Sequence, residues 1–115
     1  MKFNISINQK SAIDSGLPLD VVDLIIIDYS KWWILSRKSE KIIAENSEYT
    51  WIDYGSIIKE LPILGITGND AISRRFTKLV KCEILEKYFD KKTSRAFFRF
   101  GVNYDLLEWD GDGTV

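Results

Sequence analysis

The sequence predicts an α+β fold in which a small helical core carries a β-hairpin, and three observations support this prediction. The chain has 115 residues, the usual size of one domain. Hydrophobic residues account for 45% of it and aromatic residues for 13%, which is enough to fill a core. Helical and strand-like patterns of apolar residues both occur, and no repeat, linker or low-complexity segment separates them.

The N-terminal part is expected to form a strand followed by a short helix. Polar and apolar residues alternate over residues 2–7, a pattern typical of a half-buried strand. Residues 8–15 are expected to form a helix that directs Ala12 and Ile13 inward. Gly16 then provides a stop signal, because glycine readily adopts the left-handed conformation that ends many helices.

A longer helix and a hairpin are predicted next. Asp20 is a suitable N-cap for a helix over residues 21–36. Two β-prone runs, 40–44 and 49–52, flank the polar residues 45–48 and predict a hairpin. The apolar residues of the helix surround its axis, so we expect deep burial of Val21, Leu24, Ile25, Ile27, Trp32 and Leu35.

A third helix is expected after this hairpin. Asp53 can cap a helix over residues 54–61, which ends before Pro62 because proline cannot continue it. Gly65 then turns the chain. The buried stripe of this helix comprises Ile57, Ile58 and Leu61.

The next helix, over residues 68–81, shows a regular amphipathic pattern. Thr67 and Asn69 are both suitable N-caps for it. Its buried stripe comprises Ile72, Phe76, Leu79 and Val80. Its outward face is expected to hold Ser73, Arg74, Thr77, Lys78 and Lys81, with Arg75 at the flank. Residues 84–89 and 95–100 are then expected to form the two strands of a second hairpin.

Charge is distributed unevenly along the chain, although the net charge is only −1. Residues 69–100 hold nine Lys and Arg against four Asp and Glu, a net charge of +5, whereas residues 1–68 carry −2 and residues 101–115 carry −4. A basic block can mark a surface for a polyanion, because phosphate contacts supply most non-specific affinity for nucleic acids. A solvated charged face explains the same block on charge alone.

The order of the elements favours the first interpretation. From residue 50 onward we expect a short strand, a helix, a tight turn, a basic amphipathic helix, and a hairpin with a basic tip at residues 90–94. This is the layout of a winged helix-turn-helix, in which the second helix enters a major groove about 12 Å wide. The hairpin then contacts the adjacent backbone or minor groove. The predicted DNA-binding residues are Asn69, Ser73, Arg74, Arg75, Thr77, Lys78, Lys81, Lys91, Lys92 and Arg95.

The residue types exclude several functions. The chain has no histidine, so a Ser-His-Asp or Cys-His catalytic group cannot be built and the commonest zinc ligand is missing. No glycine-rich phosphate-binding motif is present. We therefore predict no enzymatic activity, no catalytic residue, no metal and no cofactor. The lone Cys82 fits a reducing cytoplasm, and the longest apolar run, residues 24–27, is too short to cross a membrane.

Four segments carry a resemblance to a known family: residues 49–54 (YTWIDY), 57–62 (IIKELP), 64–66 (LGI) and 71–75 (AISRR). They resemble the winged-helix domain of phage and plasmid replication proteins, the replisome-organizer or initiator-like DNA-binding proteins. Residues 3–10 (FNISINQK), Gly16-Leu17 and the long helix with Asp28 and Trp32 are similar to that family's N-terminal part. The resemblance therefore extends to about residue 104.

The resemblance implies that residues 69–81 form the recognition helix and residues 90–95 the wing. The DNA-facing bases that it implies are Arg74, Arg75 and Lys78. The chain departs from the family at Glu83, where such domains usually have a glycine that allows a left-handed helix end. We therefore expect this helix to end differently.

Together these observations predict a winged-helix domain with an N-terminal strand and helix over residues 1–104, followed by an acidic tail over 105–115. We expect it to bind double-stranded DNA in phage or prophage replication initiation or regulation. A transcriptional regulator and a protein-docking module without DNA binding are alternatives that use the same fold. We expect a cytoplasmic protein that forms a homodimer or joins replication or transcription proteins, because one basic patch binds weakly. Tyr88 and Phe98 are candidates for exposed stacking on bases.

Overall fold

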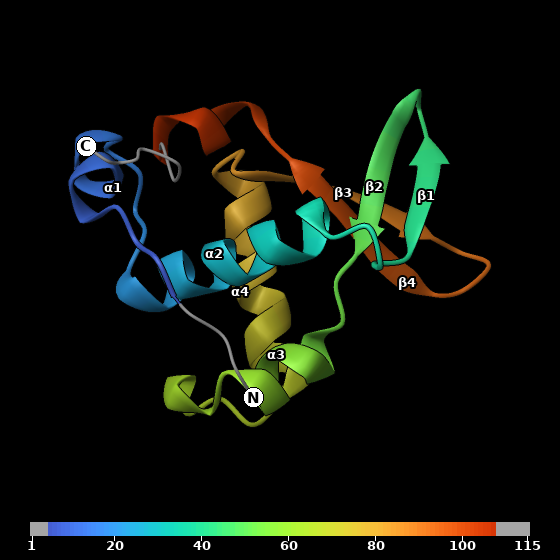
Figure 1. Ribbon diagram of the computed structural model, residues 1–115, viewed down its shortest axis with the longest axis horizontal. Coiled ribbons are helices and arrows are strands. Elements are labelled where there is room, and N and C mark those ends of the chain that lie inside the picture. Colours follow the sequence, from blue (N-terminus) through green and yellow to red (C-terminus); the bar gives the residue numbers. More distant parts are fainter. Residues whose placement is uncertain (1–4, 108–115) are drawn as a thin grey trace.

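The structure, a computed structural model, describes residues 5–107 and is α+β: helices gather beside a four-stranded antiparallel sheet (Figure 1). This confirms the predicted fold class at the level of α+β. Apart from the N-terminal strand, each predicted helix and strand is present, and its bounds agree with the observed ones to within two residues. The elements are α1 (Gln9–Asp14), α2 (Val21–Leu35), β1 (Lys41–Ala44), β2 (Ser47–Trp51), α3 (Tyr54–Glu60), the 3-10 turn η1 (Pro62–Leu64), α4 (Asn69–Lys81), β3 (Leu85–Asp90), β4 (Arg95–Phe100) and the 3-10 segment η2 (Val102–Leu107).

The sheet has the strand order β1-β2-β4-β3, and every neighbouring pair is antiparallel. Glu45 and Asn46 join β1 to β2, and both have a positive φ, as the tightest hairpin turns require. β2 pairs with β4 at Phe97 and Phe98, close to the middle of β4. The distal half of the β3–β4 hairpin therefore extends beyond β2, as Figure 1 shows.

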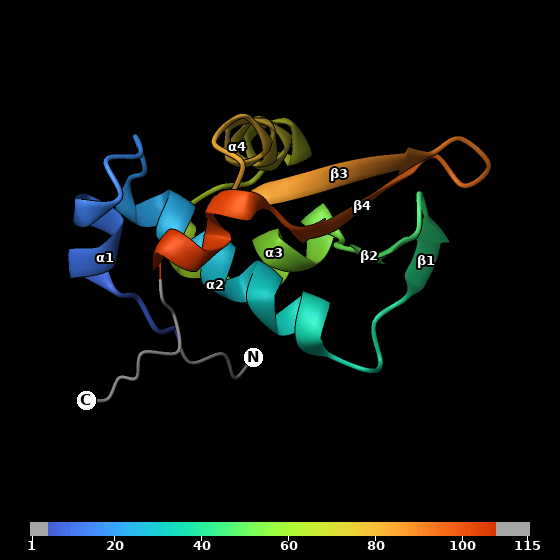
Figure 2. The same ribbon diagram turned by 90° about the horizontal axis from the view of Figure 1, so that it is seen from above.

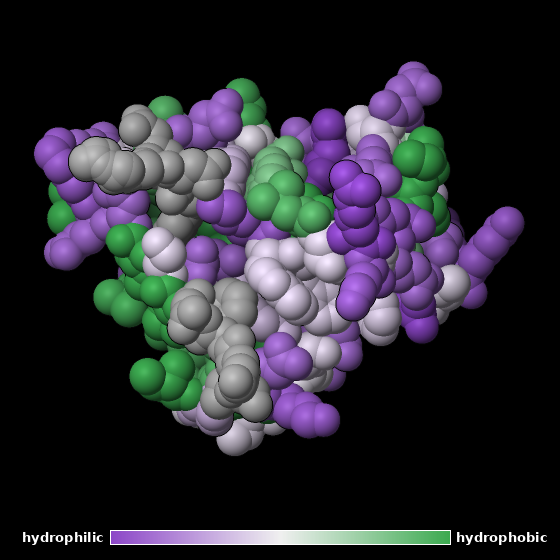
Figure 3. Space-filling view, viewed as in Figure 1, coloured by the Kyte–Doolittle hydropathy of each residue, from purple (hydrophilic) through white to green (hydrophobic). Residues whose placement is uncertain are grey.

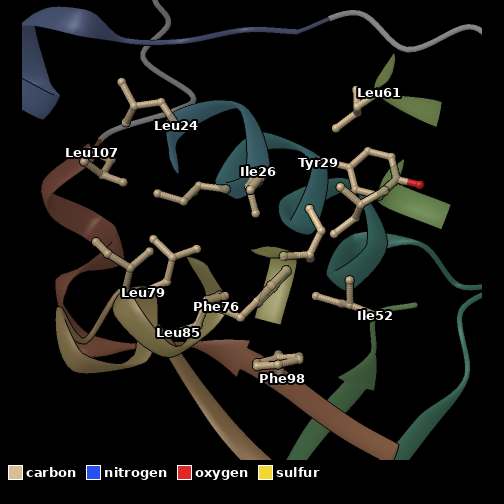
Figure 4. Close-up of a cluster of buried hydrophobic side chains, with 14 of the residues drawn as sticks. Leu24, Ile26, Tyr29, Ile52, Leu61, Phe76, Leu79, Leu85, Phe98 and Leu107 are labelled. Carbon is tan, nitrogen blue, oxygen red and sulfur yellow. The ribbon is translucent and has the colours of Figure 1, made fainter. Parts of the chain in front are cut away.

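The core lies between α2, α3, α4 and the sheet (Figure 4). The ring centroids of Phe76 in α4 and Phe98 in β4 are 4.8 Å apart, and the Tyr54 ring of α3 lies 5.1 Å from that of Phe76. Burying each large apolar side chain contributes about 1.5–3 kcal/mol. These aromatic contacts fix α4 against the β3–β4 hairpin, the two elements that the sequence predicts to bind DNA.

The start of α2 is fixed by a reciprocal cap. The Asp20 carboxylate accepts a hydrogen bond from the Asp23 N–H at 2.8 Å, and the Asp23 carboxylate accepts one from the Asp20 N–H at 3.0 Å. This confirms Asp20 as the N-cap. The Asp23 side chain is fully buried, so its charge requires further partners.

Burial along the rest of α2 differs in part from the expectation. Leu24 and Ile27 are buried as predicted, and Ile25 is partly buried against the core. The expected burial is wrong at the two ends of the helix, because one-sided packing does not cover apolar residues all around it. The exposed fractions there are 64% for Val21, 54% for Trp32 and 63% for Leu35.

The N-terminal strand predicted over residues 2–7 is wrong where the structure describes it. Residues 5–7 pair with no strand, and residues 1–4 lie outside the described range. The Ser6 N–H donates to the Asp28 carboxylate of α2 at 3.1 Å. The backbone of this segment therefore hydrogen-bonds to a side chain of α2, whereas the alternating pattern predicts a bond to a neighbouring strand.

The short helix α1 follows with one buried side. Asn8 caps it by accepting a hydrogen bond from the Ser11 N–H at 2.9 Å. Ala12 is buried as predicted, whereas Ile13 is 68% exposed, contrary to prediction. A six-residue helix that packs along a narrow stripe buries one of two adjacent residues, since neighbours point about 100° apart.

The connection from α3 to α4 follows the sequence signals, with one exception. The Asp53 carboxylate caps α3 by accepting from the Gly55 N–H at 3.1 Å, and Gly65 has the left-handed conformation expected of it. The N-cap of α4 is Gly68, which makes no side-chain hydrogen bond. The predicted caps Thr67 and Asn69 are therefore wrong. Asn69 is instead the first helical residue.

The C-terminal end of α4 has a left-handed residue despite the absence of glycine. Glu83 adopts a φ of 61°, and its N–H donates to the Val80 carbonyl at 3.0 Å. The Ile84 N–H donates to the Leu79 carbonyl at 3.0 Å, which completes the usual glycine-type helix end. The expectation that Glu83 would change this end is wrong. Gly101 permits the approach of η2, since a Cβ there would lie 2.3 Å from the Glu83 carbonyl oxygen.

The folded core extends slightly beyond the predicted domain boundary at residue 104. η2 continues to Leu107, which is completely buried against the core. Asp105 is thus part of an ordered element, and the remainder of the predicted acidic tail, residues 108–115, lies outside the described range. In the described part of the chain, no helix has the length and hydrophobicity required to span a membrane.

Candidate nucleic-acid interface

The amphipathic helix α4 buries one side and exposes a polar side, as its sequence predicts. Ile72, Phe76 and Leu79 are at most 1% exposed. Asn69, Arg74, Thr77 and Lys81 are exposed, and Ser73 is half-buried. The Thr77 hydroxyl donates to the Ser73 carbonyl at 3.1 Å. Four of the side chains predicted to bind DNA therefore lie at the surface of this helix.

Two other predicted residues, Arg75 and Lys78, face α2 instead of solvent. The Arg75 guanidinium contacts the Asp20 and Asp23 carboxylates at 2.6 and 3.0 Å. The Lys78 ammonium contacts the second Asp23 oxygen at 2.5 Å. The prediction that Lys78 lies on the outward face is wrong, because the buried carboxylate at the start of α2 draws both cations toward it.

The contacts of this cluster favour the ionised forms of Arg75 and Asp20. Hydrogen bonds to the carboxylates of Asp20 and Asp23 raise the pKa of Arg75. Burial disfavours the ionised form of Asp20, but hydrogen bonds from Arg75 and the Asp23 N–H outweigh it and lower the pKa of Asp20. The result is an ionic lock that holds the middle of α4 against the start of α2.

A groove of about 390 Å³ lies where the first turns of α4, the start of α3 and the distal half of the β3–β4 hairpin meet. It brings together three of the predicted DNA-binding residues, Asn69, Ser73 and Arg95. Burial raises the pKa of Tyr54, and a hydrogen bond with Ser73 opposes this shift. The groove is also lined by residues that were not predicted to bind: Trp51, Asp53, Tyr54, Lys87, Phe89 and Ser94.

Arg95, the first residue of β4, makes two contacts with side chains of neighbouring segments. Its guanidinium lies 4.1 Å from the centre of the Trp51 ring, and it contacts the Glu40 carboxylate at 2.8 Å. Both members of the ion pair are partly exposed, so solvent screens the pair and its contribution to stability is small. In the register of the sheet, Trp51 and Arg95 share one face, whereas Lys87 and Phe89 lie on the other.

The tip of the β3–β4 hairpin carries two exposed cations, Lys91 and Lys92. The Thr93 hydroxyl donates to the Asp90 carboxylate at 2.7 Å across the turn. Figure 2 shows α4 and this end of the hairpin along one side of the molecule, with α2 on the opposite side. Among residues 5–107, no carboxylate forms an ion pair with Arg74, Lys81, Lys87, Lys91 or Lys92.

The two aromatic residues expected to stack on bases are not exposed platforms. Phe98 is completely buried in the core, so that expectation is wrong. Tyr88 is half-buried, and its ring centroid lies 5.8 Å from that of Tyr49, which is in β2 on the same face of the sheet. Arg99 is also occupied there, in an ion pair with Glu86.

Sequence reasoning missed Lys87 and Phe89, although a signal for both was present. In the register of the hairpin they lie opposite Phe98 and Ala96. Alternate residues of a strand share one face, so Lys87 and Phe89 had to share the face of the buried Leu85, on the side of α4. Near the tip, the core no longer covers that face, and Phe89 is 51% exposed.

The surface on the α2 side of the molecule has a different character (Figure 3). Hydrophilic residues gather over the sheet, whereas hydrophobic ones gather over the start of α2 and η1, where Val21 and Ile63 are 64% and 79% exposed.

Within residues 5–107, no group of His, Cys, Asp or Glu side chains is arranged to hold a metal ion. Searches among protein-family models, curated proteins and solved structures found no match to the chain.

Proposed function

We propose that this protein binds double-stranded DNA as a winged helix-turn-helix, with α4 as the recognition helix and the β3–β4 hairpin as the wing. The order strand, helix, turn, helix and hairpin from β2 to β4 supports this proposal. The contact between α4 and β3 supports it further, since it shows that the hairpin lies beside α4. Recognition helices of this class present short polar and basic side chains to the major groove.

The proposal is supported by the groove between α4 and the hairpin, together with exposed cations on α4 and at the hairpin tip that have no carboxylate partner within residues 5–107. Arg74 and Lys81 on α4 are exposed without a carboxylate partner in the described part of the chain, and so are Lys91 and Lys92 at the tip. Two basic elements held at a fixed angle can contact the phosphates on both sides of one groove.

Different residues take different roles in this proposal. Asn69, Ser73 and Thr77 are short polar side chains on α4 that can contact base edges, and Arg74 can contact a base or a phosphate. The wing contributes phosphate contacts through its lysines. Arg75 and Lys78 act as positioning residues, because the ionic lock with Asp23 sets the orientation of α4.

The biological step that we propose is replication initiation or its regulation in a phage or prophage. The resemblance of residues 49–75 to replication proteins is the support for it. A transcriptional regulator would use the same interface, so DNA binding is common to both roles and is the property to test first.

The test is a fluorescence-anisotropy titration of a labelled random-sequence duplex at several salt concentrations. We expect binding whose log K falls linearly with log [salt], with a slope of about −0.9 for each phosphate contact. Lys91→Ala together with Lys92→Ala should reduce the affinity at low salt and flatten the slope by about 1.8.

The matched control is Lys10→Ala, which removes an exposed cation from α1, at the end of the molecule away from the hairpin in Figure 1. It should leave both affinity and slope unchanged. A parent protein with no measurable duplex binding at low salt would refute DNA binding. An equal loss in the Lys10 variant and the tip variant would refute the assigned interface.

A further inference from the structure

Another pocket, which we call the tryptophan pocket, lies between the C-terminal end of α2 and α3 and has a volume of about 360 Å³. Trp32 and Trp33 of α2 and Glu60 of α3 are among the residues that line it. None of its lining residues within the described range is among those predicted to bind DNA. Figure 2 shows α2 on the side of the molecule opposite to α4, so DNA binding does not account for this pocket.

The two tryptophans of the pocket present their ring faces in different directions. Their ring centroids are 6.2 Å apart, and their ring planes are inclined by 78°. Trp32 is 54% exposed, whereas Trp33 is partly buried. The face of an aromatic ring carries a negative potential that attracts cations, and several such faces together form the aromatic cages that bind organic cations. The two rings therefore favour a positively charged ligand.

The carboxylate of Glu60 adds a full negative charge to the pocket. Its Oε1 atom accepts a hydrogen bond from the Tyr29 hydroxyl at 2.8 Å. Tyr29 is completely buried, so this bond holds the half-buried carboxylate in a defined position. Within residues 5–107, Glu60 forms no ion pair with a Lys or Arg side chain. A partly desolvated carboxylate attracts a cation more strongly than a fully exposed one does.

The chain itself shows which cation these groups can hold. The Arg95 guanidinium lies 4.1 Å from the centre of the Trp51 ring and 2.8 Å from the Glu40 carboxylate. The tryptophan pocket offers the same two kinds of group, and its Trp33 ring lies 6.4 Å from that of Trp51. A guanidinium is planar and more weakly hydrated than an ammonium, so it both stacks on rings and pairs with carboxylates. Arginine is therefore the cation that fits this pocket best.

Two exposed apolar residues indicate that this arginine belongs to another polypeptide. Trp32 and Leu35 are three residues apart on α2, so they share one side of the helix. They are 54% and 63% exposed. The surface of a partner protein can cover both side chains, whereas a free small cation cannot. Trp and Arg are also the residues that contribute most often to the energetic centre of a protein interface.

Lys38 provides a way to separate the two possible sources of arginine. It is exposed, and it also lines the pocket. Like charges repel, so Lys38 disfavours the binding of a guanidinium group. A free arginine also carries an α-carboxylate, which Lys38 attracts, whereas an arginine within a polypeptide lacks this group.

We propose that the tryptophan pocket binds the guanidinium group of an arginine side chain of a partner protein. Trp32 and Trp33 contact the face of the guanidinium, and Glu60 pairs with its N–H groups. This inference goes beyond the proposed function and does not rest on it, because the pocket shares no lining residue of the described range with the groove beside α4.

The test follows the indole N–H resonances of the ¹⁵N-labelled protein during titration with acetyl-arginine amide, which represents an arginine within a polypeptide. Acetyl-citrulline amide is the matched control probe, because its urea group has nearly the same shape but no charge. At constant ionic strength, we expect saturable shifts of the Trp32 and Trp33 resonances with the arginine probe and none with the citrulline probe. Free arginine, the third probe, should bind no more tightly than acetyl-arginine amide.

Three variants locate the site. Glu60→Gln keeps an acceptor for the Tyr29 hydroxyl but removes the charge, so it should weaken binding of acetyl-arginine amide about fivefold. Trp32→Ala removes an exposed ring and should weaken binding about threefold. Lys38→Ala removes a repelling charge and should strengthen binding about twofold. Glu48→Gln changes an exposed carboxylate of β2 and is the matched control, which should leave the affinity unchanged. Thermal melting by circular dichroism verifies that each variant is folded.

Each outcome supports or overturns the inference. Absence of saturable shifts with acetyl-arginine amide, or equal shifts with the citrulline probe, would overturn it. Equal effects of Glu60→Gln and Glu48→Gln would also overturn it, because the carboxylate of the pocket would then not hold the cation. Tighter binding of free arginine that is weakened by Lys38→Ala would overturn the assignment to a partner protein. None of these measurements involves DNA, so their failure leaves the proposed function in place.

Discussion

Two sides of the same helix use basic residues for different purposes. Arg74 and Arg75 are adjacent in sequence, yet Arg74 is exposed, whereas Arg75 contacts the Asp20 and Asp23 carboxylates. Adjacent helical residues point about 100° apart, so one position faces solvent and the next faces α2. The locked side holds α4 in place, and the exposed side is available to a ligand.

The comparison teaches that a basic block in a sequence is not a measure of a basic surface. The cap of α2 contains a buried carboxylate, Asp23, which forms ion pairs with Arg75 and Lys78. The Glu40 and Glu86 carboxylates form ion pairs with Arg95 and Arg99. The cations without a carboxylate partner within residues 5–107 that the proposed DNA interface could use are therefore fewer than the sequence suggests, and they lie along α4 and on the β3–β4 hairpin.

The largest effect is expected when the ionic lock between α4 and α2 is removed. Asp23→Asn removes the carboxylate from a completely buried position and leaves Arg75 and Lys78 without their common partner. We expect the free energy of unfolding to fall by about 3 kcal/mol, measured by urea denaturation. Asp14→Asn, which removes an exposed ion pair with Lys10, should change it by less than about 0.5 kcal/mol. Equal effects of the two substitutions would contradict a structural role for the lock.

The second prediction compares single substitutions on the exposed side and on the locked side of α4. Arg74→Ala should weaken duplex binding about tenfold while changing the free energy of unfolding by less than about 0.5 kcal/mol. Arg75→Ala should act mainly on stability: the free energy of unfolding falls by about 1–2 kcal/mol, and duplex binding weakens less than in Arg74→Ala, because Arg75 acts on DNA only through the orientation of α4. Anisotropy titrations and urea melts of both variants give the result. If the losses in affinity are equal, then Arg75 also contacts DNA.

A smaller effect concerns the C-terminal end of α4, which connects the exposed side of the helix to the hairpin. Glu83 has a left-handed conformation, which is about 1–2 kcal/mol less favourable for a residue with a Cβ than for glycine. Glycine, however, has more conformational freedom in the unfolded chain, and this entropy offsets part of its advantage. Glu83→Gly should therefore stabilise the protein by about 0.5–1 kcal/mol, as measured by urea denaturation. Gly101→Ala should destabilise it, because its Cβ would meet the Glu83 carbonyl oxygen. Destabilisation by Glu83→Gly would show that the glutamate side chain has a role of its own.

The smallest effect contrasts two carboxylates of the α2 region through pH. Burial raises the pKa of Asp28, against the opposing influences of the Ser6 N–H and Lys31. A raised pKa means that the folded state holds the proton more tightly than the unfolded state, so the parent should gain stability relative to Asp28→Asn as pH falls through that pKa. Asp20 has a lowered pKa, so the parent should lose stability relative to Asp20→Asn as pH falls toward and below the unfolded value of about 3.9. Urea melts between pH 7 and pH 3 give both slopes, and slopes of the same sign would contradict these environments.

Local signals in the sequence were sufficient for most of the fold. Asp20 and Asp53 capped their helices, Gly65 turned the chain, and the stripe from Ile72 to Leu79 became the buried side of α4. These features depend on residues within one or two turns of each other. The alternating pattern over residues 2–7 failed because a strand also needs a neighbour, and the sheet offered none.

The candidate site was less predictable, because it depends on contacts between residues distant in sequence. Lys78 pairs with Asp23, 55 positions away, and no local pattern indicates that pair. The groove joins Trp51, Asn69 and Phe89 from three separate elements. Periodicity can assign each residue to a face, but it cannot tell which faces meet.

The most direct measurement of the DNA-binding proposal is a titration of the ¹⁵N-labelled protein with a short random-sequence duplex at low salt, followed by amide NMR shifts. We expect the shifted amides to cluster in the first three turns of α4 and in the distal half of the β3–β4 hairpin, with those of α1 and the start of α2 unchanged. Shifts centred on η1 and the exposed Val21 side of α2, or no shifts at any amide, would contradict a DNA interface built by α4 and the wing.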